Sequence, residues 1–384
     1  MNNANLQQPE VKLVHDYITQ RGGAERVALV LARAFEGAEF LTTLHNPSAT
    51  FSEFDHINVK TSWLNSFGLF RRNHRLALPL LPFAVRSLKS DAKLTIVSTS
   101  AFAHGVKASG QTLVYCHTPP RFLYLSDEYL GAGLSARVLG AALRLLKPAF
   151  RRADQMAAKR ATRYLANSTV VQARIRDVYG IEAKVVFPPH SVEIDGDLKP
   201  LFTAQEKFAQ TPFFLLVSRL LPYKNVDQVI EAFRRLPNKN LLIVGSGPLL
   251  QELQKKLPSN CLIVSGITDD ELRWAYAQAT ALLAPSLEDF GLTVIEAAAR
   301  GVPSIALRAG GYLDTVVEGE TGIFFSQPTA ESIERAVFEF ELSNFDALKI
   351  SKHAEAFSEE RFIAAIRAEA TEMLKNDSTK QAHN

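Results

Sequence analysis

The chain has little cysteine and no long apolar run. Only Cys116 and Cys261 occur among 384 residues, and they lie far apart, so the sequence predicts no disulfide framework. No apolar run approaches the ~20 residues of a membrane-spanning helix, and the polar start Met1–Glu10 predicts no signal peptide. No clustered metal ligands are visible, so we expect no metal site. Together with 47% hydrophobic and 22% charged residues, these absences predict a cytoplasmic globular protein.

The net charge of +3 hides an uneven distribution. Residues 1–190 carry 24 lysines and arginines against 13 acids, whereas residues 191–384 carry 19 against 27. Residues 134–163 contain eight basic residues and the single acid Asp154, interleaved with leucines, which predicts a basic amphipathic helix. Such a helix either lies on anionic lipid or presents a solvated face. A second basic cluster, Arg71 to Arg75, favours the membrane, and no motif supports nucleic acid binding.

Short apolar segments alternate with longer helical patterns along the whole chain. This alternation is typical of parallel sheets covered by helices, and so of an α/β fold. The expected strands are 11–15, 94–97, 113–116, 164–166, 185–187, 213–217, 241–244, 262–264, 281–284 and 304–306. Pro188-Pro189 and the polar residues that follow indicate a boundary between two Rossmann-like domains.

The richest chemistry lies in residues 284–297. Pro285–Asp289 reads as a loop after a buried strand, and Leu292–Arg300 reads as a helix. The backbone N–H groups at the start of that helix favour a diphosphate; they belong to Phe290, Gly291, Leu292 and Thr293. Glu288 and Glu296 flank this anion site at most ~12 Å apart, which suits one acid on a sugar and one on a ribose. From spacing alone, a surface helix with two ordinary glutamates explains the segment equally well.

Two cations follow another predicted strand. Arg219 and Lys224 come directly after residues 213–217, about seventy positions before the two glutamates. Fixed cations of this kind stabilise the charge that develops on a departing diphosphate. By themselves such residues are most often solvated loop charges, and it is their order along the chain that makes them specific.

Polar residues also follow strands in the first half. Gly22 and Gly23 open a helix, where glycines let backbone approach an anion or simply make the turn. His117 ends a strand before Pro119-Pro120, and it either acts on a ligand or serves as a structural hydrogen bonder. Arg121 is a candidate for an anionic acceptor, and Asp16 for an acceptor hydroxyl.

The spacing of Glu288 and Glu296, with Arg219 and Lys224 upstream, resembles the retaining glycosyltransferases of family four. The resemblance implies a GT-B fold: two Rossmann-like domains facing across a central cleft, with a C-terminal helix crossing back to the first domain. An acceptor-binding domain of residues 1–190, completed by a helix at 358–376, would precede a donor-binding domain of residues 191–357.

The resemblance also implies roles for single residues. Arg219 and Lys224 would grip the donor diphosphate, Glu288 would hold the transferred sugar, and Glu296 would hold the ribose. Gly22 and Gly23 would lie beside the diphosphate, and His117 would orient the sugar as a catalytic residue. Gly266 and Ile267 resemble the loop that contacts the nucleobase.

The substrate is less closely defined by these patterns. The segments 14–17, 22–26, 98–102 and 117–120 resemble bacterial mannosyltransferases of surface-polysaccharide assembly. This favours GDP-mannose as co-substrate, no separate cofactor, a lipid-linked or oligosaccharide acceptor, and a place at the inner face of the plasma membrane. A UDP-hexose donor, a non-catalytic nucleotide-sugar-binding partner and a nucleotide-sugar epimerase remain alternatives. An NAD enzyme is disfavoured, because Pro248 and Leu250 break the fingerprint that starts at Gly245.

Overall fold

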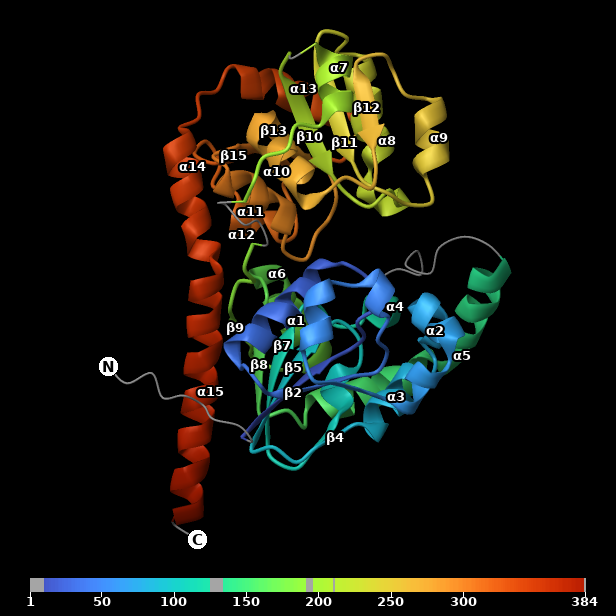
Figure 1. Cartoon of the computed structure of the whole chain (residues 1–384), viewed down its shortest axis with the longest axis vertical. Helices are drawn as coiled ribbons and strands as arrows, with labels where there is room; N and C mark the ends of the chain where they lie inside the picture. The colour runs from blue at the N-terminus through green and yellow to red at the C-terminus, as the bar shows by residue number, and fades with distance from the viewer. Residues whose placement is uncertain (1–9, 125–133, 191–195, 210, 383–384) are drawn as a thin grey trace. The chain divides into compact units, whose positions relative to one another are not determined.

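The computed structural model describes residues 10–124, 134–190, 196–209 and 211–382, with side chains omitted for 134–144 and 377–382. The chain forms two compact units, which are described separately (Figure 1). Unit 1 comprises residues 1–188 and 359–384, and unit 2 comprises residues 189–358. The helix that closes unit 1, α15, runs from Glu359 to Ala382, past the predicted end at residue 376, because no glycine or proline follows there to stop it.

Unit 1 is built on a parallel sheet with the strand order β3-β2-β1-β5-β7-β8-β9. The strands are β1 (Val11–His15), β2 (Glu39–Thr42), β3 (Val59–Thr61), β5 (Leu94–Thr99), β7 (Gln111–Cys116), β8 (Arg163–Ala166) and β9 (Lys184–Val185); β4 (Lys89–Ser90) and β6 (Lys107–Ala108) form a separate pair. The sequence prediction missed β2 and β3, which are short and mix polar with apolar residues.

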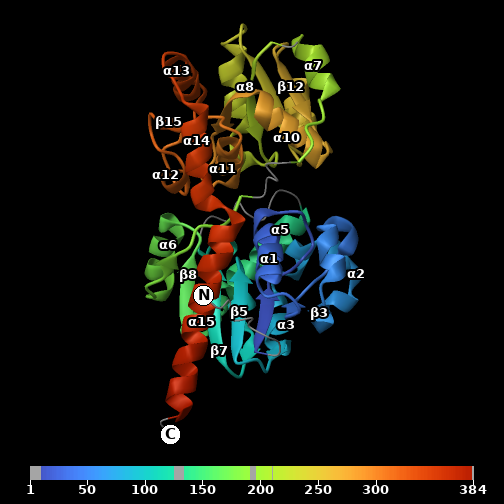
Figure 2. The same ribbon diagram turned by 60° about the vertical axis from the view of Figure 1, so that its left-hand side comes forward.

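Helices cover both faces of this sheet. Leu13, Ile96 and Leu113 pack under α1 (Gly23–Ala34) and α15, whereas the alternate residues Val14 and Val97 pack toward α6 (Thr169–Tyr179). Figures 1 and 2 both show α15 running along unit 1, where it contacts α1.

The small helices of unit 1 rest on a core of their own. They are η3 (Trp63–Ser66), α2 (Gly68–Arg72), η4 (His74–Ala77), α3 (Leu81–Ser87), α4 (Arg121–Tyr124) and the end of α5 (Leu134–Ala158). The basic helix predicted over 134–163 is therefore too long. It ends at Ala158, and Arg163 begins β8, where its guanidinium pairs with Glu369 at 2.5 Å and Glu372 at 2.8 Å. The side chains of Arg137 and Arg144 lie outside the described residues.

Unit 2 is a second parallel sheet, ordered β12-β11-β10-β13-β14-β15. Its strands are β10 (Phe213–Val217), β11 (Asn240–Val244), β12 (Cys261–Val264), β13 (Ala279–Ala284), β14 (Ser304–Leu307) and β15 (Gly322–Phe325). Helix α8 (Val226–Arg234) packs against α13 (Ala330–Glu341), and α11 (Leu292–Ala299) packs against α14 (Ala347–Ala354) and α10 (Asp269–Gln278). Each unit is thus a Rossmann-like, helix-covered parallel sheet. Within the described part of the chain, every helix is too short or too polar to cross a bilayer.

Candidate functional site

The strand order of unit 2 creates one crevice at the carboxyl edge of its sheet. From β10 the chain passes through α8 to β11 on one side, and from β13 it passes through α11 to β14 on the other. Loops that leave neighbouring strands in opposite directions open a gap, and ligands of such sheets bind there. Arg219 and Lys224 follow β10, and Glu288 follows β13, so the predicted donor residues meet at this switch point.

Lys224 and Glu288 are in direct contact. The Lys224 ammonium forms an ion pair with Glu288 Oε1, and the Ser286 hydroxyl donates to the same oxygen at 2.8 Å. The Asn225 amide donates to the Pro285 carbonyl at 3.0 Å, which clamps the two loops together. Lys224 is only 8% exposed, so its charge is held in place by the carboxylate rather than by water.

Arg219 differs from Lys224 in its surroundings. It is exposed, and its guanidinium has no hydrogen-bond partner among the residues that the structure describes. The backbone beside it is fixed, because the Leu220 N–H donates to the Ser246 carbonyl at 2.8 Å. An added Cβ at Gly245 would overlap the Ser218 carbonyl oxygen. The Gly245 segment therefore packs against the loop of Arg219, which explains glycine there without a dinucleotide.

Helix α11 starts at the crevice with a backbone that requires glycine. Gly291 is its N-cap residue, with φ of 93°, and an added Cβ would lie 2.5 Å from the Tyr312 ring. An added Cβ at Gly311 would likewise overlap Phe290 Cα. Leu292 and Thr293 form the first turn, so their N–H groups have no intrahelical carbonyl to bond. Close backbone packing thus presents this helix start to the carboxyl edge.

Glu296 lies one turn further along α11 and is held from a neighbouring helix. The Tyr276 hydroxyl, on α10, donates to Glu296 Oε2 at 2.7 Å. Burial, followed by the Glu296 charge, raises the pKa of Tyr276 well above its usual range, so the phenol stays a donor. Sequence reasoning missed Tyr276, because nothing in the pattern of α10 marks one tyrosine as a partner of α11.

Gly266 and Ile267 follow β12, at the same carboxyl edge but on the outer strand of the sheet. Gly266 adopts φ of 70°, and no atom lies within 4 Å of an added Cβ. Ile267 is partly buried against the core of unit 2. Their predicted contact with a nucleobase stays a prediction.

Unit 1 has its own switch point, between β1 and β5, and Asp16 occupies it. One carboxylate oxygen accepts the N–H groups of Phe102 at 2.8 Å and Ala103 at 2.7 Å, and the other accepts those of Ser100 at 2.6 Å and Ala101 at 2.9 Å. Asp16 is buried and shapes the loop after β5. Its predicted contact with an acceptor stays a prediction.

His117 lies just past β7 and belongs to a buried polar chain. Its Nε2 is 2.8 Å from Ser98 Oγ, and the same oxygen is 3.0 Å from His15 Nδ1. Burial and the neighbouring His15 lower the pKa of His117 to about 3, so the ring is neutral at physiological pH. Sequence reasoning found His117 as a candidate but did not single out its partners.

The other predicted residues of unit 1 take up simple positions. Gly22 is the N-cap residue of α1, and Gly23 is its first residue, as expected for a loop that opens a helix. Arg121 begins α4, four residues after His117, and is partly exposed. No described residue tests their predicted roles toward donor and acceptor.

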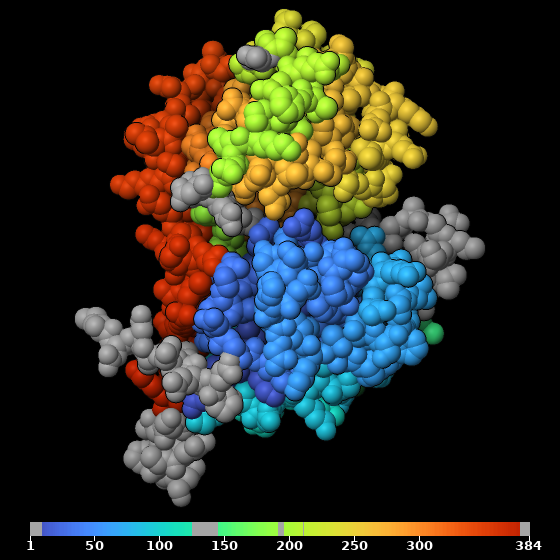
Figure 3. Space-filling view, in the orientation of Figure 1, coloured from blue at the N-terminus to red at the C-terminus, as the bar shows by residue number. Residues whose placement is uncertain are grey.

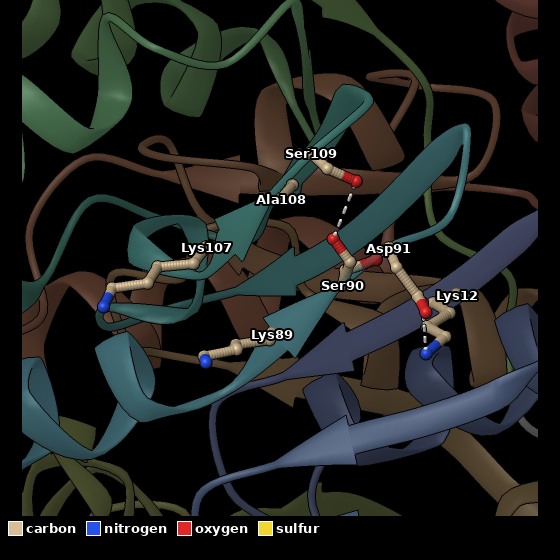
Figure 4. A pocket seen from close by; sticks show the side chains of 7 residues that line it. All are labelled: Lys12, Lys89, Ser90, Asp91, Lys107, Ala108 and Ser109. Carbon is tan, nitrogen blue, oxygen red and sulfur yellow. Dashed lines mark hydrogen bonds and ion pairs between the residues drawn. The ribbon is translucent and has the colours of Figure 1, made fainter.

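Unit 1 also has a surface hollow (Figure 4). It is lined by Lys12, Lys89, Ser90, Asp91, Lys107, Ala108 and Ser109. Lys12, near the start of β1, is paired with Asp91 at 2.6 Å and Glu39 at 2.8 Å. The predicted site residues instead follow strand ends. No group of three or more metal-ligating side chains occurs in the ranges that the structure covers.

Both halves of the chain match known families. Residues 199–360 match the model of glycosyl transferases group 1, and residues 21–195 match that of glycosyltransferase family 4. A GDP-mannose-dependent alpha-(1-6)-phosphatidylinositol monomannoside mannosyltransferase of Mycolicibacterium smegmatis is 29% identical over 192 residues, which is 44% of this chain and 50% of that protein. The glycogen synthase of Pseudomonas aeruginosa is 36% identical over 134 residues, 33% of this chain and 26% of the relative. The matches thus span half or less of the curated relatives.

Solved structures resemble the whole chain. A sucrose-phosphate synthase from Thermosynechococcus elongatus aligns with a TM-score of 0.70 at 17% identity, covering 96% of this chain and 100% of the other. Anabaena HepE in complex with UDP aligns with a TM-score of 0.67 at 18% identity, with the same coverage. At these identities the likeness shows the fold.

Proposed function

Because the chain belongs to the glycosyltransferases of family four and has their GT-B fold, we propose that it transfers mannose from GDP-mannose with retention. The acceptor in this proposal is a lipid-linked or oligosaccharide glycan of cell-surface polysaccharide biosynthesis. The observation that carries the proposal is the switch point of unit 2. There the exposed Arg219, the Lys224–Glu288 pair and the start of α11 converge on one carboxyl edge.

This arrangement suits a nucleoside diphosphate sugar. The first-turn N–H groups of α11 and the guanidinium of Arg219 would bind the diphosphate. Lys224 would shift from Glu288 toward the phosphate as negative charge develops, which frees the carboxylate to accept sugar hydroxyls. Glu296, already oriented by Tyr276, would accept the ribose hydroxyls.

Retention follows if the acceptor hydroxyl enters on the face that the diphosphate leaves. The bond between the anomeric carbon and the phosphate oxygen breaks, that oxygen takes the acceptor proton, and the new glycosidic bond forms on the same side. No protein nucleophile is needed in this scheme, so positioning and charge stabilisation supply the rate enhancement. His117 would orient the sugar as a neutral ring.

The choice of GDP-mannose rests on the mycobacterial relatives, which are GDP-mannose-dependent mannosyltransferases. A UDP-hexose donor is the closest alternative, since solved structures of the same fold hold UDP or UDP-glucose. A non-catalytic nucleotide-sugar-binding protein or an epimerase would bind the nucleotide sugar at the same residues of unit 2 but would need no acceptor.

A thermal-shift panel of GDP, UDP, ADP and their hexose conjugates tests the donor. A ligand at 100 times its Kd stabilises the folded state by about 2.7 kcal/mol. Stabilisation by GDP and GDP-mannose alone supports the proposal. Stabilisation by UDP compounds would indicate a UDP-hexose donor instead of GDP-mannose. Transfer of radiolabelled mannose to lipid-linked glycans then separates a transferase from a binding protein, and free sugar released without acceptor would indicate an epimerase.

We further propose that unit 1 docks on an anionic membrane, which would bring it to a lipid-linked acceptor. The predicted basic segment supports this: Arg151 and Arg152 of α5 are exposed, and Leu145 is 83% exposed. Residues 57–90 add a second element, with six lysines and arginines and no acid. Trp63, Phe67, Leu69 and Phe83 of this segment are 46%, 52%, 62% and 60% exposed, respectively.

Exposed aromatic rings beside cations suit a lipid headgroup region better than water. Residues 57–90, which are light blue to cyan in Figure 3, form part of the surface of unit 1. Flotation with phosphatidylglycerol vesicles tests the docking, with phosphatidylcholine vesicles as the neutral reference. The variant W63S/F67S should bind anionic vesicles less, and the matched variant F338S, at an exposed phenylalanine of unit 2, should bind normally.

A further inference from the structure

Three buried polar side chains end three adjacent strands of unit 1. His15 is the last residue of β1, Ser98 lies beside it in β5 as its register partner, and His117 follows β7. All three are buried, and they lie at the carboxyl edge of the sheet. Leu13 and Ile96, two residues earlier in β1 and β5, belong to the core under α1 and α15. The apolar core thus gives way to one short polar chain.

The serine hydroxyl couples the two rings. Ser98 Oγ is 2.8 Å from His117 Nε2 and 3.0 Å from His15 Nδ1, and a hydroxyl has only one proton to donate. If Ser98 donates to His117, then His15 must donate to Ser98; if Ser98 donates to His15, then His117 must donate to Ser98. A neutral imidazole has one N–H, so each choice also fixes which nitrogen of His117 carries the proton.

The two states differ in what His117 offers at Nδ1. In the first state His15 carries its proton on Nδ1 and donates to the Ser98 oxygen, and the Ser98 hydroxyl donates to His117 Nε2. The proton of His117 then lies on Nδ1, which has no hydrogen-bond partner among the described residues. In the second state both rings carry the proton on Nε2, and His117 Nδ1 offers a lone pair.

We propose that His15 and Ser98 are positioning residues that hold His117 in a single neutral tautomer, so that His117 Nδ1 presents one defined hydrogen-bonding group to the transferred sugar. With its proton on Nδ1 the ring would donate to a sugar oxygen, and with its proton on Nε2 it would accept from a sugar hydroxyl. The identity of the ligand rests on the proposed function; the tautomer does not.

The primary test is a nuclear magnetic resonance measurement on protein labelled with ¹⁵N-histidine. Long-range ¹H–¹⁵N correlations distinguish the two neutral tautomers of each ring. The wild-type spectrum should show one tautomer for each ring, with His15 and His117 both protonated at Nδ1 or both at Nε2, and the His117→Gln and His15→Gln variants serve for assignment. A mixture of tautomers, or a proton on Nδ1 of one ring and on Nε2 of the other, overturns the proposal, whether or not the protein transfers mannose.

Variants of Ser98 add a functional readout. Ser98→Ala removes the hydroxyl that bonds to His117, so the ring should lose its single tautomer and the turnover number should fall about ten-fold, while Kd for the nucleoside diphosphate stays constant. Ser98→Thr keeps the hydroxyl and should keep both tautomer and turnover. The matched control is Thr95→Val, which removes another buried hydroxyl of β5 and its 2.7 Å hydrogen bond to Ser90.

The outcomes separate the two ideas. A changed tautomer in Ser98→Ala together with reduced turnover supports the proposal, and an unchanged tautomer overturns it. Equal turnover losses in Ser98→Ala and Thr95→Val would mean a merely structural role and would also overturn it. If no donor supports transfer, the proposed function fails, but the tautomers of wild type and Ser98→Ala still decide whether the coupling exists.

Discussion

The two units share one architecture but use its switch point in opposite ways. In unit 1 the polar groups at the switch point satisfy one another: Asp16 accepts four backbone N–H groups, and Ser98 bridges two histidines. In unit 2 the switch point presents an exposed Arg219 and the first turn of α11. The same crevice can therefore be used for internal order or for binding, depending on whether the protein completes the hydrogen bonds itself.

Asp16→Asn is the strongest way to break the comparison. An amide replaces one acceptor oxygen with an N–H₂ group that faces backbone donors, so the free energy of unfolding should fall by about 3–5 kcal/mol. Urea denaturation followed by circular dichroism measures the loss. Asp91→Asn is the control, because its side chain is 86% exposed. If both variants were equally stable, Asp16 would not order the loop of unit 1.

Lys224→Ala tests the opposite use of the switch point in unit 2. Losing the cation that we propose faces the leaving diphosphate should lower the transfer rate about 100-fold. Because the change also removes the buried partner of Glu288, it should lower the stability as well. Steady-state kinetics with the donor selected by the thermal-shift panel measure the effect. Lys239→Ala is the matched control in unit 2, because it removes a surface ion pair with Glu341. Equal rates for the two variants would remove Lys224 from the site.

The low pKa of His117 predicts that the free energy of unfolding depends on pH. Because its folded pKa of about 3 lies below the unfolded value of 6.5, the unfolded state binds more protons between these pH values, and stability falls as the pH drops through this window. From pH 6.5 to 5.0, wild type should lose about 2 kcal/mol more than His117→Gln. Urea denaturation at both pH values measures this difference. Parallel losses would mean that the ring titrates normally.

Glu296→Gln should have the smallest effect of these variants, and it should change only the affinity for the nucleoside diphosphate. The amide oxygen can still accept from Tyr276, so the stability should stay constant, but a neutral group would accept the ribose hydroxyls of the proposed donor more weakly. Calorimetric titration should show about a ten-fold weaker affinity for the nucleoside diphosphate. Glu252→Gln, an exposed residue of α9 (Leu250–Lys255), is the control. A loss of stability without a change in affinity would assign Glu296 to internal order, as in unit 1.

The sequence predicted most of the fold because parallel strands buried on both faces appear as continuous apolar runs. Val11–His15 and Phe213–Val217 were predicted to the residue. The edge strands β3 and β15 were missed, since three or four residues with threonine or glycine carry no such run. The basic helix was predicted too long, because the charge pattern alone does not show that Arg163 begins a strand and pairs with Glu369 of α15.

The candidate site could be predicted in part for a related reason. Strand ends are visible in the sequence, and residues placed there share one edge of a parallel sheet, so Arg219, Lys224 and Glu288 were found as a set. The order of these three residues along the chain can be read from the sequence. The direct contact between Lys224 and Glu288 depends on the fold and cannot be read there.

The sequence by itself determined the alternation of strands and helices, the strand ends that carry polar residues, and the glycine that starts α11. Each of these depends on local periodicity or backbone conformation. Only the tertiary structure decided that Asp16 faces inward to a loop, that Tyr276 orients Glu296, and that Ser98 joins His15 to His117. Such contacts join residues up to 87 positions apart, and a hydrogen bond depends on distance in space, which strand order sets and local pattern does not.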